Sequence, residues 1–151
     1  MDTKFFQFES DFVNSLRCIP MVVRYKLDTC GVKLKLSHWN YFNLAEREAL
    51  VDLPCSTPNE IKTYREFLQE LVTKQTGSPA SELPTEEHPA WMDDKIIPAD
   101  VLGKAQEERV NITVEQWANL SPLQRFALIK LSRPSHENNN FLPAIREFEL
   151  A

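Results

Sequence analysis

Residues 17–39 read RCIPMVVRYKLDTCGVKLKLSHW, and a weaker copy of this stretch returns later in the chain. Shifted by 78 residues, it lies over KIIPADVLGKAQEERVNITVEQW at 95–117, and the match continues without a gap to residues 53 and 131. Ten of the 37 aligned pairs are identical, whereas ordinary composition gives about two or three by chance. The alignment predicts an internal duplication, with a first unit at about 17–75 and a second at about 95–150.

Each predicted unit consists of helices. Pro20 and Pro98 suit the first position of a helix, where no backbone N–H is needed, and apolar residues follow at helical spacing until Gly31 can end the first copy. Three capping boxes predict the starts of further helices, namely Asn43 with Glu46, Thr57 with Glu60, and Ser121 with Gln124. The fold class is therefore predicted to be all-α, with two helical units related by a pseudo-twofold axis.

A short strand is predicted in each unit as well. Apolar residues alternate with polar ones at Val32, Leu34 and Leu36, and the copy matches them with Val110, Ile112 and Val114. This is the period of a strand with one buried face. By symmetry we expect the two strands to pair with each other as a tiny ribbon between the copies.

Between the units lies an acidic, proline-rich connector, TGSPASELPTEEHPAWMDD, at residues 76–94. Residues 75–94 hold five acids and no Lys or Arg, which accounts for the net charge of −5 that 17 Lys+Arg and 22 Asp+Glu give the chain. We expect a solvated linker without regular structure. The alternative is a tether that contacts a partner through Trp91. The length of 151 residues favours a single domain over residues 1–151.

Composition excludes several classes of function. Three glycines are too few for a phosphate-binding loop or a dinucleotide-binding turn. The acidic balance argues against partners such as nucleic acid or a membrane surface. The start, MDTKFFQFESD, lacks the apolar stretch of a signal peptide, and the three cysteines form no C-x-x-C pair. A cytoplasmic protein with reduced thiols is expected.

Several segments together resemble one family. The opening FFQFESDFV at 5–13, the run CIPM at 18–21 followed by KLD and CG, Trp39, and AEREAL at 45–50 are all similar to the nitrate reductase-associated proteins. These are small proteins of photosynthetic and some other bacteria, usually encoded beside nitrate-assimilation or molybdopterin genes. The resemblance covers nearly the whole chain. It implies an accessory protein that active, molybdenum-containing assimilatory nitrate reductase requires, through cofactor insertion, maturation or stabilisation.

That resemblance brings no catalytic residue and no cofactor of the chain's own, only an indirect association with the molybdenum cofactor through the client. The expected partner is nitrate reductase or the machinery that delivers its cofactor. We place the contact surface on the first copy, with the connector tryptophan added, because the less faithful second copy replaces Met21, Arg24, Tyr25 and Asp28 with Ala99, Leu102, Gly103 and Gln106. The candidate partner-binding residues are Arg17, Cys18, Met21, Arg24, Tyr25, Asp28, Cys30 and Trp91.

The sequence leaves two alternatives to an accessory protein, a thiol-based redox or metal-binding protein and a DNA-binding regulator. A thiol-based redox or metal-binding protein would use Cys18, Cys30 and Cys55, although their spacing fits no zinc or iron–sulfur signature. A helix-turn-helix regulator built on residues 37–53 is disfavoured, because its reading helix offers mainly Arg47 as a basic contact. The sequence thus favours a protein-binding module over an enzyme, a metal protein or a DNA-binding regulator.

Overall fold

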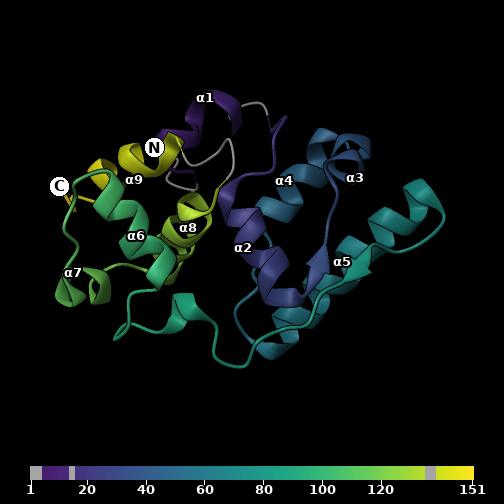
Figure 1. The fold of residues 1–151 in the computed structure, drawn as a ribbon. Helices are drawn as coiled ribbons and strands as arrows, with labels where there is room; N and C mark the ends of the chain where they lie inside the picture. Colours follow the sequence, from purple (N-terminus) through teal and green to yellow (C-terminus); the bar gives the residue numbers. More distant parts are fainter. Residues whose placement is uncertain (1–4, 14–15, 135–138) are drawn as a thin grey trace. The chain divides into compact units, whose positions relative to one another are not determined.

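The computed structural model describes residues 5–13, 16–134 and 139–151, and it is mostly helical with one small antiparallel ribbon (Figure 1). The chain forms two compact units, Met1–Thr85 and Glu86–Ala151, which we call unit 1 and unit 2. Their boundary falls inside the acidic connector, so each unit takes part of that segment. The prediction of a mainly helical protein is confirmed.

Unit 1 begins with short turns and ends with its longest helix followed by a strand. Its elements are η1 Gln7–Glu9, α1 Ser10–Val13, α2 Met21–Cys30, β1 Val32–Lys33, α3 Leu36–Tyr41, α4 Leu44–Asp52, α5 Pro58–Thr76 and β2 Ser81–Glu82. The predicted capping boxes begin α4 and α5. Pro20 was predicted to be the first helical residue of α2. In the structure it is the N-cap, one position before the helix begins. Gly31 ends α2 in the left-handed conformation, with φ of 76°.

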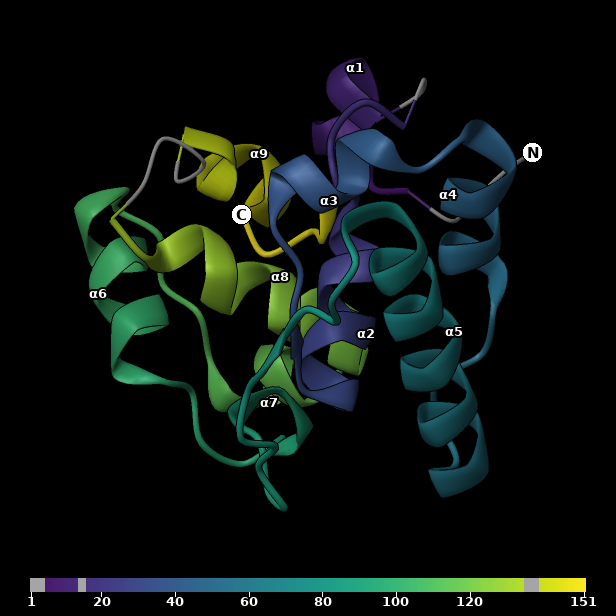
Figure 2. The same ribbon diagram turned by 90° about the vertical axis from the view of Figure 1, so that its right-hand side faces the viewer.

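The strand β1 pairs with a different segment from the one predicted. Val32 pairs with Glu82 and Lys33 with Ser81, so β1 joins the connector and not residues 110–114 of the second copy. The extended chain after α5 returns to β1 (teal in Figure 2). It is held by the side-chain amide of Gln69, which donates to the Ala80 carbonyl at 2.9 Å and accepts from its N–H at 2.7 Å. The expectation of a connector without regular structure is therefore wrong for this part.

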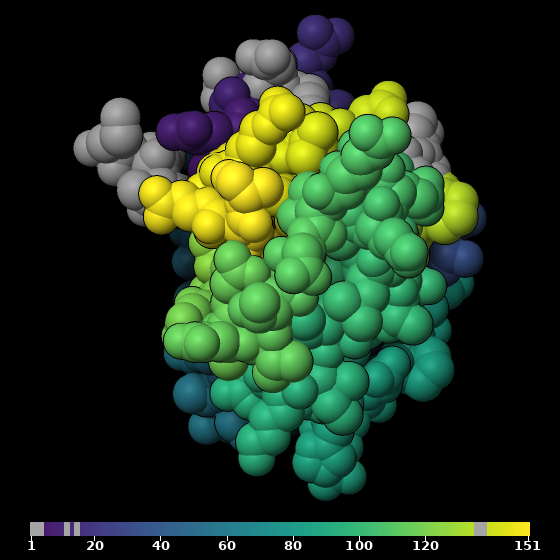
Figure 3. Space-filling model, turned by 60° about the vertical axis from the view of Figure 1, so that its left-hand side comes forward, coloured from purple at the N-terminus to yellow at the C-terminus, as the bar shows by residue number. Residues whose placement is uncertain are grey.

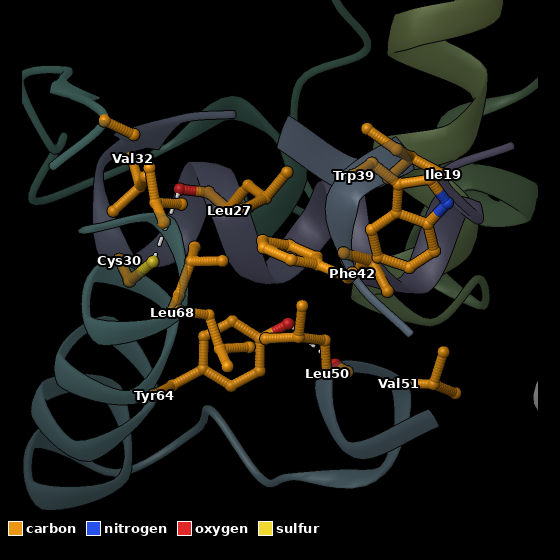
Figure 4. Close-up of a cluster of buried hydrophobic side chains, with 14 of the residues drawn as sticks. Ile19, Leu27, Cys30, Val32, Trp39, Phe42, Leu50, Val51, Tyr64 and Leu68 are labelled. Carbon is orange, nitrogen blue, oxygen red and sulfur yellow. Dashed lines mark hydrogen bonds between the residues drawn. The ribbon is translucent and has the colours of Figure 1, made fainter. Parts of the chain in front are cut away.

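The core of unit 1 lies between α2, α4 and α5 (Figure 4). Its largest fully buried side chains are Trp39, Tyr64, Leu50 and Leu68. The Tyr64 hydroxyl points to the end of α4 and donates to the Leu50 carbonyl at 2.6 Å. A buried phenol needs such a partner, because an unpaired hydroxyl in a core is costly.

Unit 2 consists of η2 Ala90–Met92, α6 Ala99–Glu107, α7 Val114–Ala118, α8 Pro122–Ser132 and α9 Phe141–Glu147. The predicted capping box begins α8, with Ser121 Oγ accepting from the Gln124 N–H at 3.1 Å. Helix α8 supplies much of the core, including Phe126 and Leu128, and contacts η2, α6 and α9. The starts of α6, α7 and α8 each lie 78 residues after those of α2, α3 and α4.

Candidate functional site

The predicted partner-binding residues around α2 separate into exposed, half-buried and buried positions. Arg17 is exposed, whereas Cys18, Arg24, Tyr25 and Asp28 are half-buried. Met21 and Cys30 are buried, with 5% and 1% of their surface exposed. Cys30 belongs to the core cluster of unit 1. Both buried side chains offer almost no surface to a partner, so their prediction as contact residues is corrected.

The start of α2 is stabilised by a buried carboxylate that the sequence analysis did not single out. Glu9, 3% exposed, accepts from the Met21 N–H at 2.9 Å through Oε1 and from the Phe6 N–H at 3.3 Å through Oε2. A negative charge is favourable at a helix N-terminus, where backbone N–H groups lack partners within the helix. Arg24 is also tied to this end, since its Nε donates to the Ile19 carbonyl at 3.2 Å.

Two of the three cysteines lie in the core with their thiols protonated. Burial raises the pKa of Cys30 to about 12, and the neighbouring Cys55 adds to this effect. Burial likewise raises the pKa of Cys55 to about 11, opposed by the charge of Lys26. A reactive cysteine needs a lowered pKa and access to solvent. Cys30 and Cys55 have neither property, and only Cys18 is partly accessible.

Lys26 acts inside the fold as well. Its Nζ donates to the carbonyls of Val51 and Leu53, both at 2.6 Å, and lies 5.7 Å from the centre of the Tyr64 ring. The carbonyls at the end of α4 lack partners within the helix, and a cation there is favoured by the helix dipole. The aligned residue in unit 2, Lys104, instead forms ion pairs with Glu108 at 3.3 Å and with Glu107 at 4.0 Å.

The arginine that a DNA-binding regulator would have used is occupied within unit 1. Arg47 Nη1 donates to the Leu16 carbonyl at 2.9 Å, and its Nε and Nη2 donate to the carbonyls of Trp39 and Asn40 at 3.2 Å each. The Trp39 indole N–H donates to the same Leu16 carbonyl at 2.8 Å. Arg47 therefore caps α3, and together the two side chains fix the segment before α2. We call this pair the tryptophan–arginine clamp of unit 1.

Unit 2 carries a second tryptophan–arginine clamp at the aligned positions. Arg125, 6% exposed, donates to the Trp91 carbonyl at 2.8 Å and to the Leu120 and Trp117 carbonyls at 2.9 and 3.2 Å. The Trp117 indole N–H donates to the Asp93 carbonyl at 2.9 Å. Both clamps thus tie the segment before the first long helix of their unit to the carbonyl end of the following short helix. The sequence contained a signal for them, since an arginine and a tryptophan are identical in the two aligned segments.

Trp91 is part of unit 2 rather than a tether through solvent. Its ring is half-buried and packs edge-to-face on Phe126, with ring centres 5.1 Å apart and planes at 84°. Its carbonyl accepts from Arg125. The expectation of an unstructured connector is wrong here too, because η2 packs against α8.

Within residues 5–13, 16–134 and 139–151, no three His, Cys, Asp or Glu side chains gather where they could hold a metal ion. In the same residues, no helix has the length and apolar character that crossing a membrane requires.

Comparison with known protein families gives a match over nearly the whole chain. The family model described as conserved nitrate reductase-associated protein matches residues 5–148. No curated protein and no solved structure matches the chain significantly. The matched range includes both units and both tryptophan–arginine clamps. The chain therefore belongs to the family of conserved nitrate reductase-associated proteins.

Proposed function

We propose that the chain is a non-enzymatic accessory factor that binds nitrate reductase and supports its active, molybdenum-containing form, by aiding cofactor insertion or by stabilising the enzyme. The observation that carries this proposal is the family match over residues 5–148. The chemistry of the core is consistent with it. The cations Lys26, Arg47 and Arg125 donate to backbone carbonyls, and the buried thiols remain protonated.

The proposal also includes a duplication of the helical unit. It is supported by the spacing of 78 residues between the starts of three helix pairs, and by the two tryptophan–arginine clamps at aligned positions. The aligned residues Gly31 and Arg109 both have positive φ, 76° and 58°. In a duplicated protein, one copy is free to change its surface while the other keeps the contacts of the fold.

We place the contact with nitrate reductase on unit 1. Its exposed large apolar side chains at the two ends of α3 and the start of α4 are Leu36, Tyr41 and Leu44, which are 56%, 61% and 56% exposed. We call these three residues the unit 1 apolar surface. Aromatic side chains such as tyrosine are enriched at protein-binding surfaces, and Tyr41 is the aromatic residue among the exposed large apolar residues that the structure describes. At the aligned positions unit 2 has Val114, Asn119 and Pro122, so only unit 1 offers this combination.

The proposal is tested by co-purification from nitrate-grown cells of the host. Tagged wild-type chain is compared with a variant in which the unit 1 apolar surface is changed to serine. A matched control changes three exposed apolar residues of unit 2, namely Met92→Ser, Ile96→Ser and Val114→Ser, whose exposures are 54%, 67% and 53%. We expect reductase to be captured by wild type and by the control, and not by the unit 1 variant.

Failure has two distinguishable forms. If wild type captures no reductase, the proposed partner is wrong. If the unit 1 variant captures as much as wild type, the partner is right and the surface is wrong. Circular dichroism of each variant checks that its helices remain. We expect them to remain, because exposed side chains contribute little to stability.

A further inference from the structure

In unit 1, an extended segment covers the backbone edge that follows the first long helix. β2 pairs with β1, and the Leu83 N–H donates to the Gly31 carbonyl at 2.7 Å. The approach is so close that a Cβ at position 31 would lie 2.7 Å from the Leu83 carbonyl oxygen. Glycine at this position is therefore required by the segment that crosses it.

The aligned edge in unit 2 is uncovered. Residues 110–111 align with β1 and follow α6 as β1 follows α2. Within the described part of the chain, the backbone N–H and C=O groups of Asn111 and Ile112 form no hydrogen bond. A hollow of about 430 Å³ adjoins these two residues. It is formed by the C-terminal half of α6 and the chain that follows, which are exposed on the face shown in Figure 3 (green). Its lining residues are Leu102, Ala105, Gln106, Arg109, Val110, Asn111 and Ile112.

Arg109 stands at the rim of this hollow in an unfavourable backbone conformation. Its φ is 58°, in the left-handed region that favours glycine. Its N–H donates to the Gln106 carbonyl at 3.0 Å, and the Val110 N–H donates to the Ala105 carbonyl at 2.8 Å. This is the Schellman ending of a helix, at which the aligned residue of unit 1 is a glycine.

The side chain of Arg109 gains nothing within the fold that would offset this strain. It is exposed, and its guanidinium has no ion pair or hydrogen bond within the described residues. The adjacent acids Glu107 and Glu108 face Lys104 instead. The left-handed conformation itself belongs to the helix ending and recurs at Glu149, which has φ of 60° at the end of α9. What Arg109 adds to this ending is an exposed guanidinium. An unpartnered guanidinium beside an unpaired backbone edge is complementary to an extended peptide that carries a carboxylate.

We infer that residues 109–112 and the adjoining hollow bind an extended, acidic peptide segment of a partner protein, which adds as a strand to this edge while Arg109 pairs with its carboxylate. In unit 1 the equivalent place is taken by SEL, residues 81–83, which also carries an acid. Since a Cβ is present at position 109, the bound peptide has to turn away after about two paired residues. This inference does not depend on nitrate reductase, because it concerns a different surface from the unit 1 apolar surface.

The test uses the full chain labelled with ¹⁵N and a synthetic peptide, SPASELPTEE, with the sequence of residues 78–87. In unit 1 the tethered copy of this segment has an effective concentration in the millimolar range and outcompetes added peptide. The added peptide is therefore directed to unit 2. We expect the amide signals of residues 110–112 to shift on titration, while those of β1 stay in place.

Three variants decide the role of Arg109. Arg109→Gln is expected to weaken peptide binding about tenfold, as loss of a charge-assisted hydrogen bond does. Arg146→Gln is the matched control, because Arg146 is another exposed arginine of unit 2, and it should change the affinity less than about twofold. Arg109→Gly should weaken binding while raising the melting temperature, because glycine relieves the strain.

Several outcomes would overturn the inference. One is the absence of shifts at residues 110–112, and another is displacement of β2 with shifts confined to β1. Equal weakening by Arg109→Gln and Arg146→Gln would show attraction by overall charge instead of a site. A melting temperature that falls in Arg109→Gly would show that Arg109 serves the fold.

Discussion

The buried arginine of the unit 2 clamp allows a quantitative test of what stabilises this fold. Arg125 is 6% exposed, and its guanidinium has only carbonyl oxygens as partners within the described residues. Arg125→Leu removes the donors and leaves the carbonyls of Trp91 and Leu120 without them. A hydrogen bond to a charged group contributes about 1.5–3 kcal/mol, and a buried unsatisfied carbonyl costs about 1–3 kcal/mol. Leucine recovers part of this loss through apolar burial.

The expected net loss for Arg125→Leu is about 4 kcal/mol of the free energy of unfolding, a large share of the 5–15 kcal/mol that is typical of folded proteins. Arg47→Leu is the matched variant in unit 1. It should cost only about 1 kcal/mol, because Arg47 is half-exposed and water can replace it at the carbonyls. Arg125→Lys should fall between the two Leu variants, since lysine keeps the charge without the planar fork.

The assay is urea unfolding followed by circular dichroism, with amide hydrogen exchange of α4 and α8 to assign the loss to one unit. Exchange is needed because two units can unfold separately. A loss below about 1 kcal/mol for Arg125→Leu, or equal losses for the two Leu variants, would refute the claim that burial of the arginine sets its contribution.

Three further predictions follow from the core of unit 1. In the folded chain at neutral pH, Cys30 and Cys55 should resist a thiol reagent, whereas the partly accessible Cys18 should react. Fast reaction of all three thiols would restore the redox hypothesis. The pKa of Cys30 is raised from 9.0 to about 12, so the stability gained by burying the neutral thiol is present below pH 9 and lost as pH rises from about 9 to 12. Urea midpoints across this range should fall less steeply in Cys30→Ala. Gly31→Ala should destabilise the chain more than Gly77→Ala. Both positions have positive φ, but only position 31 is crossed by the segment after β2. Equal losses of about 1 kcal/mol in the free energy of unfolding, measured by thermal unfolding, would contradict this.

Local signals in the sequence predicted the helix ends well. The capping box of Asn43 and Glu46 forms with both hydrogen bonds at 2.8 Å, and Gly31 ends α2 with φ of 76°. Such features depend on residues within a few positions of each other, so the sequence contains all the information they need. Apolar character alone is less reliable near a helix end, since Ala45 in the first turn of α4 is exposed.

Long-range pairing could not be predicted in the same way. The alternation at β1 indicates a backbone edge, yet it carries no information on which segment will pair with that edge. The actual partner, Ser81–Glu82, has no apolar alternation and is exposed on both residues. It is positioned instead by Gln69 through two hydrogen bonds to Ala80, a contact that no local pattern reveals.

The burial of polar side chains was the second feature that the sequence did not predict. Glu9 stands in the phenylalanine-rich stretch 5–13, where no local pattern marks it as a cap, and only the fold shows that it caps α2. The role of Arg47 and Arg125 in the two clamps was likewise hidden, although these arginines occupy aligned positions of the two similar segments. Among the candidate residues, Met21 and Cys30 were misplaced because an amphipathic helix this short can be rotated in either direction by its packing.

The most direct test of the accessory role is a measurement on nitrate reductase itself in a host strain that lacks this chain. Reductase polypeptide, its bound molybdenum and its nitrate-reducing activity are quantified in the same nitrate-grown cells. The proposed function predicts near-normal polypeptide with little activity and little bound molybdenum, both restored when the wild-type chain is returned. Unchanged activity and molybdenum per reductase polypeptide would contradict it.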